Sequence, residues 1–148
     1  MNDTPNFASI LDEAPTEISR PKPLPEGTYI CIVGTPEEGV SRGKQTPYVR
    51  FPLKPIASLD DVDPMDLEAS GGLENKTLRI DFWATSDAIY RLDEFHTHCG
   101  IDITDAVPRR IRNTEAVNSQ VLAVVKHRQD QNDPSRFYTD VVRTAIAD

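Results

Sequence analysis

The sequence predicts one β-rich domain with five strands and a single α-helix between the third and fourth strands. Its 148 residues suit a domain with one hydrophobic core. Five short segments show the apolar alternation or the β-branched enrichment that is typical of strands. A single segment repeats its apolar residues at the spacing of an amphipathic helix.

The chain is expected to begin with a flexible arm over residues 1–25, because this segment combines low hydrophobicity with five prolines that lack backbone donors. Residues 26–148 are expected to form the domain. Strand one is predicted at residues 28–33, where successive side chains point to opposite sides of the strand. One side carries Tyr29, Cys31 and Val33 and the other carries Ile30 and Ile32, so both faces are apolar.

Strand two is predicted at residues 48–54, after a polar stretch with two glycines that turns the chain. Pro52 inside this strand predicts an edge position or a bulge, because proline cannot donate to the ladder. Residues 55–75 hold six acidic residues and no basic one, and they end in Gly71-Gly72. The apolar residues of this segment repeat at no regular spacing, and the segment is predicted to form a long mobile loop.

Strand three, at residues 76–85, has the clearest alternation in the chain. Leu78, Ile80 and Phe82 share one face, and Arg79, Asp81 and Trp83 share the other. A helix is predicted directly afterwards, capped by Thr85 or Ser86 and ending before Gly100. Its apolar stripe, which we expect to pack on the sheet, consists of Ala88, Leu92, Phe95 and Cys99.

Residues 101–118 are expected to form a loop with at most one helical turn. Strand four follows at residues 120–128, and turn-forming residues then connect it to strand five at residues 137–146. This order of elements matches the oligonucleotide-binding (OB) fold, a five-stranded, partly open barrel with its helix between strands three and four. The competing architecture is an open antiparallel sandwich covered by one helix.

The net charge of −8 does not exclude nucleic acid as a partner, because the excess negative charge is local. It lies in the arm and the acidic loop, and the rest of the chain has fourteen acidic and fourteen basic residues. The acidic N-terminus and the lack of any run of about 18 apolar residues predict a cytoplasmic protein without membrane contact. Cys31 and Cys99 are far apart, which predicts neither a disulfide framework nor a zinc site.

No residue pattern in the chain predicts an enzyme, a cofactor or a metal site. His96, His98 and Cys99 are close in sequence, but the two histidines diverge on a helix, which predicts surface histidines and a core cysteine. Asp81 and Asp140 are predicted to be solvated or ion-paired strand residues, because no nucleophile or phosphate-cradling motif accompanies them.

Aromatic and basic side chains alternate on the predicted strands, and binders of single-stranded DNA need this combination. Bases stack on rings for about 1–3 kcal/mol each, and cations neutralise the phosphates. In the OB fold, the face of strands two and three and the loops one-two and four-five form the groove. Trp83 and the two tyrosines also fit the core or its edge. The predicted site consists of Arg42, Lys44, Tyr48, Arg50, Arg79, Trp83, Lys126, Arg128, Arg136 and Tyr138.

Three features follow one another over residues 25–146. They are Pro25-Glu26-Gly27-Thr28-Tyr29, then Ser41-Arg42-Gly43-Lys44 before Tyr48-Val49-Arg50-Phe51, and then Phe82-Trp83 before a helix that ends at Cys99-Gly100-Ile101. This order resembles the single-stranded DNA-binding proteins of bacteriophage replication modules. The resemblance implies an OB fold that coats replication intermediates in the host cytoplasm without sequence preference. It also allows self-association and contacts with replication proteins.

Two other function classes stay open at this stage. A virion or tail assembly protein would use the arm and the acidic loop for protein contacts and would ignore oligonucleotides. A regulator that mimics DNA would use the acidic loop, although its acidic residues are confined to one stretch.

Overall fold

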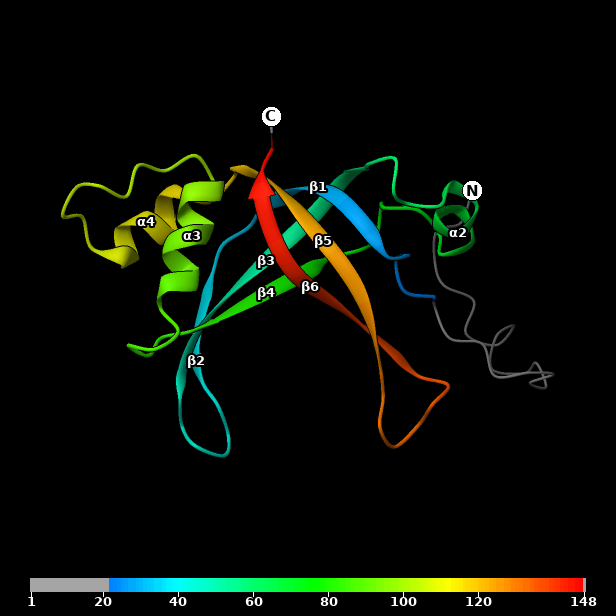
Figure 1. Cartoon of the computed structure of the whole chain (residues 1–148), viewed down its shortest axis with the longest axis horizontal. Helices are drawn as coiled ribbons and strands as arrows, with labels where there is room; N and C mark the ends of the chain where they lie inside the picture. The colour runs from blue at the N-terminus through cyan, green and yellow to red at the C-terminus, as the bar shows by residue number, and fades with distance from the viewer. Residues whose placement is uncertain (1–21, 148) are drawn as a thin grey trace, which may run out of the picture.

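The computed structural model describes residues 22–147, so all but the last four residues of the predicted arm lie outside the described part (Figure 1). The mainly β architecture predicted from the sequence is confirmed. The strands are β1 (Gly27–Val33), β2 (Glu37–Val40), β3 (Pro47–Ser58), β4 (Leu78–Trp83), β5 (Gln120–Gln129) and β6 (Phe137–Ile146). The helices are α2 (Pro64–Ala69), α3 (Tyr90–His98) and α4 (Arg109–Glu115).

All strands belong to one antiparallel sheet in the order β2-β3-β1-β5-β6, and β4 pairs with β3. β3 is the longest strand, and its first half pairs with β2 and β4 while its second half pairs with β1. β4 and β6 also approach each other (Figure 1), although no ladder joins them within the described residues. The sheet therefore curls so that β4 comes close to β6.

The prediction of five strands and one helix misses one strand, β2, and two helices, α2 and α4. β2 is the additional strand, and it lies in the polar stretch that was predicted only to turn the chain. Its four residues pair with the start of β3, so that Glu37 lies opposite Arg50 and Gly39 opposite Tyr48. β2 has no buried residue, and so it carries none of the apolar alternation by which a strand is found in sequence.

The acidic segment 55–75 differs from the long loop that was predicted. β3 continues to Ser58, and α2 forms from Pro64, because the Asp63 carboxylate accepts hydrogen bonds from the backbone N–H groups of Met65 and Asp66. After α2, the Lys54 ammonium donates to the backbone carbonyls of three residues, Leu73, Glu74 and Lys76. None of the described helices is both long and apolar enough to span a membrane.

Pro52 is tolerated in β3 although β3 is not an edge strand. The proline lies between the part of β3 that pairs with β2 and the part that pairs with β1, so a missing N–H is least costly there. Its carbonyl accepts a hydrogen bond of 2.8 Å from the backbone N–H of Gly34. The register of β1 against β3 is also irregular between Ile30 and Cys31, opposite Pro55, so a bulge does occur in this strand pair.

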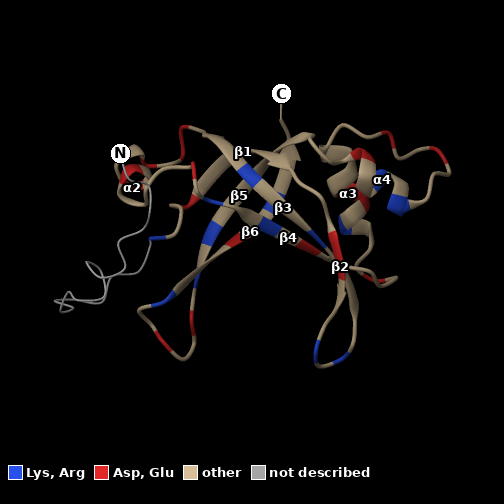
Figure 2. Cartoon of the chain, turned by 180° about the vertical axis from the view of Figure 1, so that it is seen from behind, with Lys and Arg blue, Asp and Glu red and all other residues tan. Residues whose placement is uncertain are grey.

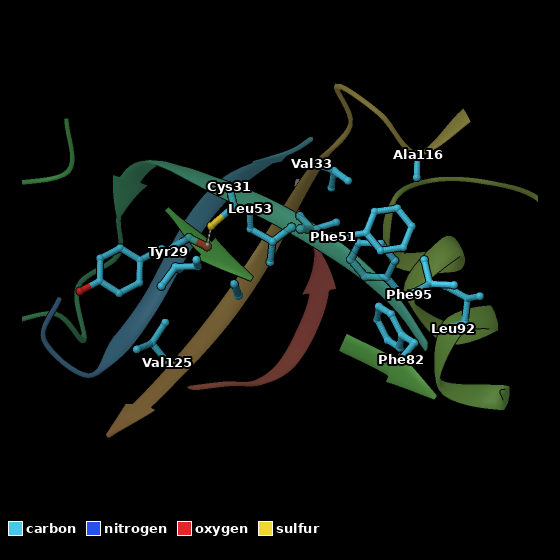
Figure 3. Close-up of a cluster of buried hydrophobic side chains, with 14 of the residues drawn as sticks. Tyr29, Cys31, Val33, Phe51, Leu53, Phe82, Leu92, Phe95, Ala116 and Val125 are labelled. Atoms are coloured by element: carbon cyan, nitrogen blue, oxygen red, sulfur yellow. Dashed lines mark hydrogen bonds between the residues drawn. The ribbon is translucent and has the colours of Figure 1, made fainter. Parts of the chain in front are cut away.

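The core lies inside the curled sheet and is closed at one end by α3 (Figure 3). Tyr29, Cys31 and Val33 of β1 are fully buried, as their alternation predicts. The Phe51 ring of β3 packs against Phe82 of β4 and Phe95 of α3, with ring centroids 6.1 and 4.9 Å away. The aromatic cluster thus joins the sheet to the helix.

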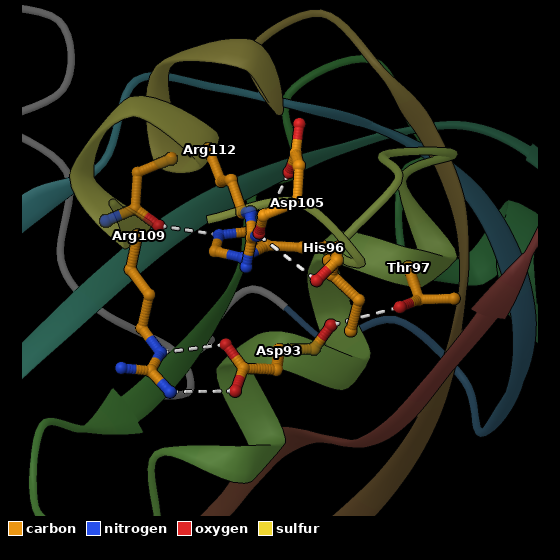
Figure 4. A network of polar contacts seen from close by, with 8 residues as sticks. Asp93, His96, Thr97, Asp105, Arg109 and Arg112 are labelled. Atoms are coloured by element: carbon orange, nitrogen blue, oxygen red, sulfur yellow. Dashed lines mark hydrogen bonds and ion pairs between the residues drawn. The ribbon is translucent and has the colours of Figure 1, made fainter. Parts of the chain in front are cut away.

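The prediction that His96 is a surface residue is wrong, because α4 covers that side of α3 (Figure 4). The His96 side chain is fully buried, and its Nε2 lies 2.8 Å from Oδ1 of Asn113 on α4. Burial lowers the pKa of the imidazole and so favours its neutral form. Cys99 is only partly buried, at the end of the same helix, rather than in the core.

Candidate nucleic-acid interface

The solvent-facing side of β3 and β4 brings together several of the predicted site residues. Side chains alternate along a strand, and Val49, Phe51 and Leu53 of β3 belong to the core. Tyr48, Arg50 and Pro52 therefore point outward. The register places Tyr48 opposite Trp83 and Arg50 opposite Asp81, and Pro52 lies opposite Arg79. This outer face therefore carries two aromatic rings and two arginines in neighbouring rows.

Tyr48 and Trp83 form a pair of rings on this face, in which Trp83 is exposed and Tyr48 is partly buried. Their centroids are 5.9 Å apart, and the ring planes meet at 84°, which is the edge-to-face arrangement that aromatic pairs favour. Trp83 is 45% exposed, so the alternative that it belongs to the core is wrong. A hollow of about 320 Å³ lies beside the indole and is lined by Ser41, Lys44, Thr46, Trp83, Thr85 and Ala88. This side of the indole is therefore open to a flat ring, and Lys44 also lines the hollow.

Gly39 of β2 lies next to the Tyr48 ring, on the strand that pairs with the start of β3. A Cβ atom at this position would lie 2.5 Å from the Tyr48 hydroxyl oxygen and 2.6 Å from its Cζ atom. The row Gly39, Tyr48 and Trp83 thus runs across three paired strands. The missing side chain at Gly39 lets the tyrosine ring lie over β2.

We expect Gly39→Ala to displace the Tyr48 ring and to change the environment of Trp83, because the added Cβ has no room beside the ring. Trp83 is the only tryptophan, so its fluorescence emission reports this change directly. The matched control is Gly43→Ala in the same hairpin, where an added Cβ would meet no atom within 4 Å. Equal emission spectra for both variants and the unaltered protein would contradict the proposed packing.

Arg50 is held between a carboxylate and a ring on the same outer face. Its Nε and Nη2 atoms donate to the two carboxylate oxygens of Asp81, at 2.7 and 3.1 Å. This hydrogen bonding raises the pKa of the guanidinium. The guanidinium carbon also lies 5.1 Å from the centroid of the Tyr48 ring. Arg79 is exposed and lines a second hollow of about 290 Å³ together with Arg50 and Glu37.

A second cluster of predicted residues lies on the hairpin of β5 and β6. The guanidinium carbons of Arg128 and Arg136 lie 4.7 and 5.3 Å from the centroid of the Tyr138 ring. Arg128 Nε donates to Asp140 at 2.8 Å, and the Tyr138 hydroxyl donates to Asp130 at 2.8 Å. Tyr138 is therefore already in contact with two cations and Tyr48 with one, whereas Trp83 borders an open hollow.

The two hairpins extend toward the same end of the molecule (Figure 1). Arg42 and Lys44 lie at the tip between β2 and β3, and Arg136 lies in the turn between β5 and β6. Both hairpins carry basic residues, and the acidic residues around α2 lie away from the hairpin tips (Figure 2). Carboxylates nevertheless lie beside several of the predicted cations: Asp81 pairs with Arg50, Asp140 pairs with Arg128, and Asp130 and Asp133 lie in the hairpin of β5 and β6.

Lys126 has different surroundings from the other predicted residues. The backbone N–H of His127 donates to the Glu26 carboxylate and lowers its pKa, and the charge of the neighbouring Lys126 lowers it further. Lys126 also contributes to the lowered pKa of Asp61, after the hydrogen bonds from Thr28. Lys126 therefore lies near Glu26, just before β1, and near Asp61, before α2.

Sequence reasoning missed the contributions of Gly39, Asp81 and Asp140 to this surface. Both aspartates were predicted to be solvated or ion-paired, and both are ion-paired, but their partners, Arg50 and Arg128, follow only from the strand register. A glycine that lies under a ring has no sequence signal that separates it from a turn glycine. Within residues 22–147 no group of three or more histidine, cysteine or acidic side chains is arranged to hold a metal ion.

No protein-family model matches the chain, and no curated protein matches it either. The interpretation of this surface therefore depends on its geometry and charge.

Proposed function

We propose that the protein binds single-stranded DNA without sequence preference, with the outer face of β3 and β4 as the stacking surface. The observation that carries the proposal is the pair of rings formed by Tyr48 and the exposed Trp83, next to Lys44 and the two arginines of the same face. Every base has a π-face, so rings of this kind bind bases of any identity. The cations supply the phosphate contacts.

The connectivity of the sheet supports an OB fold. β1 pairs with both β3 and β5, α3 lies between β4 and β5 in the chain, and β4 comes close to β6 without a ladder between them. A partly open Greek-key barrel is built in this way. In such a barrel, the face of β3 and β4 and the two hairpins would form the oligonucleotide groove, and β2 would lengthen the hairpin before β3.

The resemblance to bacteriophage single-stranded DNA-binding proteins supports a role in phage DNA replication or recombination, in the host cytoplasm. The protein would act there by coating the strand, without catalysis and without a cofactor. Self-association along the strand and contacts with replication proteins belong to the same proposal. The acidic segment around α2 is then available for protein contacts, because it lies away from the hairpin tips.

A titration with oligo-dT at low salt tests the proposal. We expect the fluorescence of Trp83 to be quenched, since a base that stacks on the indole would enter the hollow beside it. The logarithm of the association constant should fall linearly with the logarithm of the salt concentration, with a slope of about −0.7 for each phosphate that is neutralised. A duplex of the same length and an RNA strand serve as comparisons for ligand preference.

The rival function, a virion or tail assembly protein, gives the opposite result in the same experiment. It predicts a discrete oligomer in sedimentation and no change of Trp83 fluorescence with any oligonucleotide. Absence of a complex with single-stranded DNA at low salt would refute the proposed function.

A further inference from the structure

We infer that two matching Asp–Arg–Tyr clusters on the strands are phosphate subsites, each occupied in the free protein by its own carboxylate. Asp81 and Asp140 would then set how tightly single-stranded DNA is held. This inference rests on the proposed function and adds the identity of the residues that limit its affinity.

The first cluster joins β3 to β4. Asp81 receives two hydrogen bonds from Arg50, whose guanidinium lies over the Tyr48 ring. The arginine side chain is 29% exposed and the aspartate side chain 37% exposed. The pair is therefore held in place by its neighbours and is still open to a ligand from solvent.

The second cluster repeats the same three side chains on a different pair of strands. Arg128 lies directly opposite Tyr138 in the β5 and β6 ladder, and its guanidinium lies over that ring. Asp140 accepts from two nitrogens of Arg128, at 2.8 and 3.5 Å. Exposure is higher here, at 60% for the arginine side chain and 40% for the aspartate.

A phosphate can replace each of these carboxylates because both groups present two oxygen atoms to the fork of the guanidinium. An exposed ion pair of this kind contributes only about 0–1 kcal/mol to stability, so the exchange is easy. The tyrosine beneath the arginine keeps its guanidinium plane oriented during the exchange. The displaced aspartate then stays next to the phosphate and repels it, which weakens the complex.

A third bidentate pair in the molecule differs in position and surroundings. Arg109 of α4 donates to both carboxylate oxygens of Asp93 on α3, at 2.8 and 2.9 Å (Figure 4). This pair ties two helices together away from the strands, and no tyrosine among the described residues lies under its guanidinium. Asp93 therefore provides a control with the same charge change and the same lost ion pair.

The test compares Asp81→Asn, Asp140→Asn and the double variant with Asp93→Asn. Each single strand variant should bind labelled oligo-dT about two- to fivefold more tightly, because its arginine no longer has to leave a carboxylate. The double variant should gain roughly the product of the two effects. Asp93→Asn should stay within about twofold of the unaltered protein in 0.1 M salt, where charges beyond about 10 Å are screened.

Circular dichroism checks that each variant is folded, and the two aspartates lie on separate hairpins, so one variant still tests the idea if the other does not fold. Unchanged or weaker binding by both strand variants would overturn the inference and leave the proposed function in place. Equal tightening by Asp93→Asn would overturn it too, because the effect would then be one of net charge. Failure of the unaltered protein to bind would instead refute the proposed function itself.

Discussion

Replacing Tyr48 and Trp83 together with alanine is expected to weaken the binding of oligo-dT at least roughly thirtyfold. Each ring that stacks on a base contributes about 1–3 kcal/mol, and the double variant removes both rings of this pair. Because the variant has no tryptophan left, the affinity must be measured by the fluorescence anisotropy of a labelled oligonucleotide.

Ile111→Ala is the control for this experiment. Ile111 is 50% exposed, close to the 45% of Trp83, but it belongs to α4 and not to the outer face of β3 and β4. Its removal should leave the affinity within about twofold, because surface residues away from a site contribute little to binding. A folded double variant that binds as tightly as the unaltered protein would exclude these rings as the stacking surface.

Phe51→Ala is expected to lower the free energy of unfolding by about 3–5 kcal/mol, the usual cost of removing a buried phenylalanine. The Phe51 side chain is fully buried, and its ring contacts Phe82 and Phe95, so the substitution leaves a cavity between the sheet and α3. Urea unfolding, followed by circular dichroism, measures the change.

Ile56→Ala in the same strand provides the comparison. Ile56 is 44% exposed, and its truncation should cost less than about 1 kcal/mol, because little of the removed surface was withdrawn from water. Similar losses for both substitutions would mean that the outer and inner faces of β3 are assigned wrongly, and with them the face that carries Tyr48.

The strands were predictable from local patterns because alternation reports burial directly. In β4, Leu78 and Phe82 are buried while Arg79 and Trp83 are exposed, in agreement with the expected faces. β2 was missed because none of its residues is buried, and α2 because an acidic stretch obscured the capping of its first turn by Asp63. In both cases hydrogen bonds, and not an apolar period, define the element.

The candidate site was predictable as a set of residues but not as an arrangement. Tyr48 and Arg50 were expected on one face of a strand, and they are. Their partners come from β4, whose position in the sequence is separated from β3 by the whole acidic segment. The fit of Gly39 beneath the Tyr48 ring likewise depends on the pairing of a strand that the sequence did not predict.

The cap predicted at Thr85 or Ser86 is wrong, because α3 begins only at Tyr90 and has no side-chain cap. The sequence by itself determined which side of β3 and of β4 is apolar, that a helix follows β4 and ends before Gly100, and which stretch holds the excess negative charge. These properties are local, because they depend on side-chain period and turn chemistry within about ten residues. Tertiary structure alone decided that His96 is buried under α4 and that Asp81 and Asp140 hold Arg50 and Arg128. Those outcomes depend on strand register and on the covering of one element by another, which bring together residues that are far apart in the chain.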